Sequence, residues 1–136
     1  MATFHLELVT PDRVVFSDRV RSVRVPGIEG ALGVMAGHAP LMTALAVGPV
    51  KVEFENGDIE FIATSGGFVD VGRNRVTVLT DTAERADDID VVRVEEAIAR
   101  ARLALAGGGT ESYERAHESL ERATNRLRVV QMREHP

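Results

Sequence analysis

The chain has 136 residues, with no cysteine, a single lysine (Lys51), fifteen arginines and a formal charge of −5. The lack of cysteine excludes a disulfide framework, a thiolate nucleophile and a zinc ribbon, and a lone lysine outside any Gly-Lys-Ser/Thr sequence excludes a Walker phosphate loop. An acidic chain with six aromatic residues also lacks the basic, aromatic surface that nucleic-acid binding requires.

The first half of the chain alternates between apolar and polar residues, which predicts β-strands with one face exposed to solvent. Phe4, Leu6 and Leu8 are the apolar residues of the first such run, and residues 22–25 and 50–55 alternate in the same way. The N-terminus itself lacks the basic start and apolar run of a signal peptide. Together with the missing cysteine, this is consistent with a reducing cytoplasm.

Residues 30–50 carry no charged side chain and are long enough to span a membrane. Four glycines, two prolines and His38 within this segment favour loops and a buried strand instead. We therefore expect no direct membrane insertion.

Turn residues separate the expected strands. Asn56-Gly57 between two alternating runs predicts a hairpin, and Gly72-Arg73-Asn74 predicts a second turn. Ser65-Gly66-Gly67 is typical of a bulge or corner. About eight to ten short strands in residues 1–84 predict an antiparallel β-sandwich.

Residues 85–136 follow a helical period. Helices are expected at about 90–106 and 111–132, separated by the glycines at 107–109, and they form an antiparallel hairpin. The fold class is therefore α+β. The expected apolar seam of the second helix is rich in alanine, so the hairpin buries little area, is held weakly and can switch position. This seam comprises Tyr113, Ala116, Leu120, Ala123, Leu127 and Val130.

Several residues are candidates for chemical sites. The glycines at 27, 30, 33 and 37 fit neither the dinucleotide fingerprint nor the Walker loop, which favours tight turns over a phosphate cradle. His38 is a candidate general base without a nameable orienting partner, and Ser65 lies in no nucleophile elbow. The acids around residues 81–90 favour a helix N-terminus, since their spacing matches no metal-ligand pattern.

Taken in order along the chain, five motifs resemble the epsilon subunits of F-type, proton-translocating ATP synthases. The resemblance covers essentially the whole chain, and the ordered set is specific although no single motif is. The motifs are Leu8-Val9-Thr10-Pro11, the glycine-rich run at 25–34, Gly37-His38-Ala39-Pro40-Leu41, Ser65-Gly66-Gly67-Phe68-Val69 and the run at 76–83.

The resemblance implies a non-catalytic rotor subunit of the central stalk, with no cofactor of its own. Its β-sandwich is expected to dock against the gamma subunit and the membrane c-ring, coupling proton translocation to ATP synthesis in the catalytic head. The matching interface residues are Ile28, Glu29, Gly30, Ala31 and His38. Ala31 and Ala36 replace an acid and a proline seen in relatives. The expected location is the cytoplasmic face of the bacterial inner membrane, as a peripheral subunit.

The resemblance also implies a regulatory hairpin. Family members fold this hairpin onto the sandwich or extend it along gamma, where it restrains ATP hydrolysis. Some bind regulatory ATP through an Ile/Leu-Asp-x-x-Arg-Ala motif, which matches Ile89, Asp90 and Arg93 here, with Val94 in place of the alanine. Helix capping and ion pairing explain the same residues equally well.

Basic residues of the second helix are the expected contacts with acidic surfaces of the catalytic alpha and beta subunits. A different class of function remains as an alternative, in which the chain is a free-standing ATP-sensing module whose hairpin closes on nucleotide. The basic residues are Arg115, Arg122, Arg126, Arg128 and Arg133.

Overall fold

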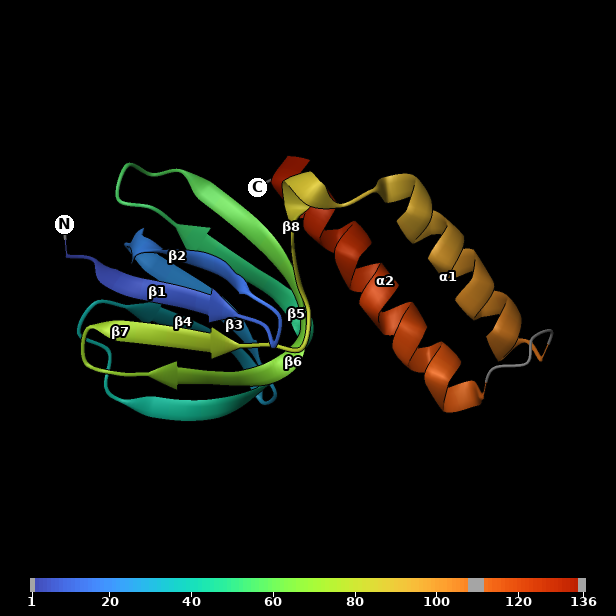
Figure 1. Cartoon of the computed structure of the whole chain (residues 1–136), viewed down its shortest axis with the longest axis horizontal. Coiled ribbons are helices and arrows are strands. Elements are labelled where there is room, and N and C mark those ends of the chain that lie inside the picture. The colour runs from blue at the N-terminus through green and yellow to red at the C-terminus, as the bar shows by residue number, and fades with distance from the viewer. Residues whose placement is uncertain (1, 108–111, 135–136) are drawn as a thin grey trace.

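The computed structural model describes residues 2–107 and 112–134. Its N-terminal part is a β-sandwich, and two helices pack against one side of it (Figure 1). The strands are β1 (Phe4–Val9), β2 (Val14–Val20), β3 (Ser22–Gly27), β4 (Gly30–Met35), β5 (Leu41–Glu53), β6 (Ile59–Val71), β7 (Arg75–Leu79) and β8 (Ala83–Arg85). A short 3-10 helix, η1 (Ala86–Asp88), precedes α1 (Val91–Leu105) and α2 (Tyr113–Glu134).

The strands are hydrogen-bonded in the order β2-β1-β7-β6-β5-β3-β4, and β8 pairs with β6. The β-sandwich expected from the alternating pattern is confirmed. The pairing is not antiparallel throughout, because β1 and β7 run parallel. The strands are also not all short, since β5 and β6 have 13 residues each and curve across the sandwich (Figure 1).

Both predicted turns are present. β5 and β6 form a hairpin closed around Asn56-Gly57, where Gly57 has a φ of 93°. The backbone N–H of Gly72 donates to the Arg75 carbonyl (2.8 Å) at the β6–β7 turn. Gly67 has a φ of 117°, and a Cβ there would lie 1.8 Å from the Leu79 oxygen, so only glycine fits at this corner of β6.

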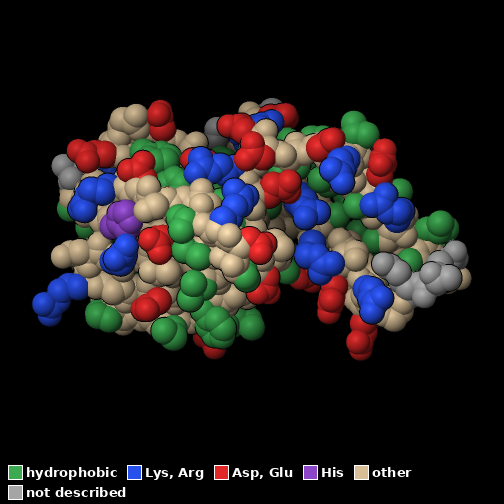
Figure 2. Space-filling model, in the orientation of Figure 1, with side chains coloured by type: hydrophobic (Ala, Val, Ile, Leu, Met, Phe, Trp, Pro, Cys, Tyr) green, Lys and Arg blue, Asp and Glu red, His purple; other side chains and the backbone are tan. Residues whose placement is uncertain are grey.

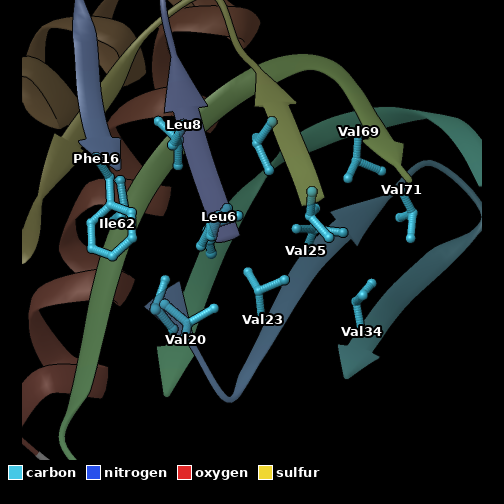
Figure 3. Packing of buried hydrophobic residues seen from close by; sticks show 14 of the residues in the cluster. Leu6, Leu8, Phe16, Val20, Val23, Val25, Val34, Ile62, Val69 and Val71 are labelled. Carbon is cyan, nitrogen blue, oxygen red and sulfur yellow. The ribbon is translucent and has the colours of Figure 1, made fainter. Parts of the chain in front are cut away.

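The main core fills the space between the layers of the sandwich. Its side chains come from nearly every strand and point toward one another (Figure 3). They include Leu6, Leu8, Val20, Val23, Val25, Val34, Ile62, Val69 and Val71. The apolar residues of the alternating pattern therefore point into this core, and the polar residues between them lie on the outer faces of the strands.

The first half of β6 is covered on its outer face as well, which corrects the expectation of one wet face along this part of the strand. Phe61 and Ala63 are buried in a second core with residues of both helices, while Ile62 between them faces the main core. Figure 1 shows α2 lying between the sheet and α1. The helical hairpin is thus docked on the sandwich.

The buried residues of α2 agree only in part with the apolar seam predicted from the sequence. Along α2, Ala116, Ala123 and Val130 are buried as expected, but Tyr113 is exposed, and Asn125 and Val129 are buried in addition. α2 has two packed faces because it contacts both α1 and the sheet. α1 ends at Leu105, and Gly107 adopts a φ of 84°, as a C-terminal glycine does; residues 108–111 lie outside the described residues.

Candidate functional site

The β3–β4 turn presents a rigid, exposed tip. Gly27 pairs with Gly30, leaving Ile28 and Glu29 at the tip, and a Cβ on Gly27 would lie 2.6 Å from the Gly30 oxygen. The Ile28 N–H donates to the Ala44 carbonyl (3.0 Å), which ties the turn to β5. Ile28 is 65% exposed, so an apolar side chain and a carboxylate project from a well-held loop.

His38 lies away from this turn. Its backbone N–H donates to the carbonyl of Met35, the last residue of β4, whereas the turn lies at the first residue, Gly30. At about 3.3 Å per residue, β4 separates the two by about 17 Å. The His38 ring nitrogen Nδ1 lies 2.7 Å from the Ala39 carbonyl, which satisfies it locally. The structure therefore does not bring His38 together with residues 28–31.

The outer face of β5, β6 and β7 carries three exposed apolar side chains that we call the outer patch: Met42, Phe68 and Leu79. Phe68 lies directly opposite Leu79 on β7, and Ala44 lies opposite Phe68 on β5, so these side chains share a face with Met42, two residues before Ala44. Figure 2 shows hydrophobic side chains along the lower rim of the sandwich, where these strands run in Figure 1. Exposed apolar clusters of this kind mark interaction surfaces.

Two residues of the expected nucleotide motif, Asp90 and Arg93, line a pocket of about 300 Å³ between β8, α1 and α2. Asp90 is the N-cap of α1, and its carboxylate accepts a hydrogen bond from the Arg93 N–H (3.3 Å). The capping role is therefore the one that the structure displays for Asp90. Ile89 is buried in the second core rather than facing the pocket opening.

The pocket has three carboxylates and three guanidinium groups. The sequence motif predicted Asp90 and Arg93 as nucleotide contacts, whereas Arg126 was expected to contact the catalytic subunits. Glu84 and Arg100 were not predicted, because they come from separate elements or turns. Arg126 forms an ion pair with Glu84 (Nε to Oε1, 3.1 Å), whereas Arg93 and Arg100 form no ion pair with any described residue. The lining residues are Glu84, Asp88, Asp90, Arg93, Val94, Ala97, Arg100 and Arg126.

The other arginines of α2 fall into two groups. Arg133 is engaged in docking: its Nη1 donates to the Ala86 carbonyl (3.1 Å) and to the Asp87 carboxylate (2.9 Å). Arg115 and Arg128 are exposed, and Arg122 donates to the Ser119 hydroxyl (3.4 Å). The docked hairpin thus occupies Arg126 and Arg133 and leaves Arg115 and Arg128 exposed.

The Ser65 hydroxyl has structural hydrogen-bond partners. It is hydrogen-bonded to the Thr82 hydroxyl and accepts a hydrogen bond from the Thr82 N–H (3.1 Å), which ties β6 to the segment before β8.

Within residues 2–107 and 112–134, no group of three or more histidine or acidic side chains is arranged to hold a metal ion. No helix among these residues is long and apolar enough to cross a membrane.

Two family models match the chain in succession. The β-sandwich domain of the ATP synthase delta/epsilon chain matches residues 3–86, and its long alpha-helix domain matches residues 87–131. The chain belongs to the ATP synthase delta/epsilon chain family.

Relatives within this family match over nearly their full length. An ATP synthase epsilon chain from Desulforamulus reducens is 45% identical over 130 residues, covering 95% of this chain and 98% of that one. The epsilon chain from Staphylococcus haemolyticus is 43% identical and covers 98% of this chain and all of its own.

Solved structures agree with the family assignment. A chain in the cryo-EM structure of the Euglena gracilis mitochondrial ATP synthase (OSCP, F1 and c-ring) has a TM-score of 0.82 and 27% identity. That match covers 92% of this chain and 79% of the other. A chain of the Tetrahymena thermophila enzyme shares the fold alone, with a TM-score of 0.61 and 14% identity.

Proposed function

We propose that this chain is a non-catalytic rotor subunit in the central stalk of an F-type ATP synthase, where it couples proton flow through the c-ring to ATP synthesis in the catalytic head. The outer patch is the observation that carries this proposal. Met42, Phe68 and Leu79 are 66%, 53% and 48% exposed on a rigid sheet, which suits permanent subunit contact. The Euglena relative, whose structure includes F1 and the c-ring, supports the same placement.

Two separate surfaces of the sandwich suit two different contacts. We assign the outer patch to the gamma subunit and the β3–β4 turn, residues 28–31, to the polar loops of the c-ring. Transmission of torque requires turns that do not deform, and Gly27 and Gly30 allow such a turn here. His38, at the far end of β4, then contacts a separate part of the stalk. The assembled subunit lies at the cytoplasmic face of the bacterial inner membrane, bound peripherally through these partners.

Deletion of the chain tests the rotor role. Membranes without it are expected to lose coupled ATP synthesis, and the tagged chain is expected to co-purify with gamma and the c-ring. Normal coupling in its absence would contradict the proposal.

The two matched family domains are assigned different roles. In this proposal residues 1–84 dock and residues 85–136 regulate. The docked hairpin ties up Arg126 and Arg133 in ion pairs with Glu84 and Asp87. Extension would release both arginines, and with Arg115, Arg122 and Arg128 they would meet acidic surfaces of the alpha and beta subunits and restrain hydrolysis. Truncation after Ala83 is then expected to raise the ATPase activity of the assembled enzyme; unchanged activity would remove the restraint.

The pocket between the hairpin and β8 favours a second function, nucleotide sensing, either within the synthase or as a free-standing module. Arg93 and Arg100 line it without an ion-pair partner among the described residues, and a phosphate chain would supply one. Titration of the isolated protein with ATP tests this, with Arg93→Ala as the variant and Arg73→Ala, on the exposed β6–β7 turn, as the matched control. Absence of binding at millimolar ATP would eliminate sensing and leave the rotor role intact.

A further inference from the structure

One buried amide joins α2 to the sheet. Asn125 is 8% exposed, and its Nδ2 donates to the carbonyl oxygens of Gly48 on β5 (3.1 Å) and Thr64 on β6 (3.2 Å). Gly48 and Thr64 face each other in the register of the β5–β6 pair. A single side chain of the hairpin therefore bonds two central strands at one point.

The receiving site is held in place. The Thr64 side chain is 1% exposed, and its hydroxyl donates to the same Gly48 carbonyl (3.0 Å). The backbone of Gly48 packs closely against Pro26 on β3, since a Cβ there would lie 2.5 Å from the Pro26 Cβ. The two carbonyl oxygens can therefore accept both hydrogen bonds from Asn125 at only one position of α2 along the sheet.

The surrounding second core supplies little directional information. Its buried contributions from α2 are Ala123, Val129 and Val130, and the burial of apolar surface is non-directional, so it does not by itself select one position of the helix. A polar group with fixed partners differs, because a displaced helix would leave buried donors and acceptors unpaired. Single buried amides set the register of packed helices in coiled coils for this reason.

The amide also limits the stability of docking. Asn125 Oδ1 is buried and has no hydrogen-bond partner among the described residues. In the undocked state water donates a hydrogen bond to this oxygen, and docking removes that bond without replacing it. The resulting desolvation cost offsets part of the free energy gained from the two Nδ2 hydrogen bonds.

We propose that Asn125 is the positioning residue of the docked hairpin: it selects one register of α2 on β5 and β6, and its unpaired oxygen keeps that docked state exchangeable. The inference stands on the docked hairpin and does not require ATP binding or assembly into a rotor.

Spin-label distances test the proposal in the full-length chain. Because the protein has no cysteine, Arg73→Cys and Glu114→Cys introduce labels only at the exposed β6–β7 turn and at the exposed start of α2. Asn125→Ala and Asn125→Asp are made in this background. Asn56→Asp, in the exposed β5–β6 turn, is the matched control for the added charge. Amide resonances of β1 and β3 report whether the sandwich remains folded.

The Ala variant is expected to keep its helix content and its sandwich but to replace the single docked distance by a broader distribution. The Asp variant places a carboxylate against two carbonyl oxygens, and its undocked-to-docked ratio is expected to rise about tenfold or more. The Asn56→Asp control is expected to match the parent. A narrow, parent-like distance in the Ala variant would overturn the proposal. Loss of the sandwich resonances in that variant would also overturn it, since Asn125 would then be required for folding rather than for docking.

Discussion

The outer patch makes a quantitative prediction for Phe68. A buried aromatic residue covers about 150–250 Å², and 53% of this residue is exposed, so with a middle value of about 200 Å² a partner that covers it removes about 100 Å² from water. At about 25 cal/mol per Å², this contributes about 2.5 kcal/mol, or about 70-fold in affinity. Phe68→Ala should therefore weaken binding of the chain to a synthase complex that lacks it by about that factor.

The assay measures affinity and stability side by side. Titration of the depleted complex with labelled protein gives the affinity, and urea denaturation of the free chain shows whether the sandwich survives. Ile59→Ala is the matched control, because Ile59 is 42% exposed at the opposite end of the same strand. Equal affinities for Phe68→Ala and the parent would refute the assignment of the patch as a docking surface, as would an equal loss in the Ile59→Ala control.

Three further predictions concern the fold. Gly67→Ala is expected to cost at least about 2 kcal/mol in urea denaturation, because its Cβ would overlap the Leu79 oxygen at a positive φ, whereas Gly33→Ala, with open space around it, should be tolerated. Asp90→Ala removes the N-cap of α1 and should lower the stability of the hairpin by about 1 kcal/mol in thermal melts, while Asp90→Asn retains the cap; equal losses in both would argue against capping. The hydrogen bond from Arg21 holds the pKa of Glu53 below its usual value of 4.5, so its contribution is complete above that pH and is lost as the pH falls through the lower folded-state pKa. The stability difference between the parent and Glu53→Gln should therefore shrink in denaturation series from about pH 6 to about pH 3, and a constant difference would contradict this linkage.

Local patterns predicted the elements well, because each strand and turn depends on neighbours in sequence. Asn56-Gly57 closes the β5–β6 hairpin because glycine readily adopts the positive φ found there. The parallel pairing of β1 with β7 was not predicted, since its partners, such as Leu6 and Val76, are seventy residues apart. Nothing in either strand's own pattern specifies a partner so distant.

The features missed at the candidate sites have the same origin. Phe61 and Ala63 belong to an alternating strand, and only the docked hairpin turns their outward face into a core. Asn125 is polar and was left out of the expected seam, yet it is buried because two carbonyl oxygens of the sheet accept its hydrogen bonds. The sequence motif predicts Asp90 and Arg93, which line one side of the pocket, whereas Arg100 lies two turns later on α1 and outside the motif. Tertiary contact therefore decided what local periodicity did not.

Proton-driven ATP synthesis in inverted membrane vesicles measures whether this chain couples proton flow to ATP synthesis. Vesicles stripped of this chain are reconstituted with the parent protein, with Phe68→Ala or with buffer alone. We expect synthesis to be lost without the chain and to return with the parent. With the variant it should return only at a concentration about 70-fold higher, because its affinity is lower by that factor. Full synthesis in vesicles that received buffer alone would contradict the account.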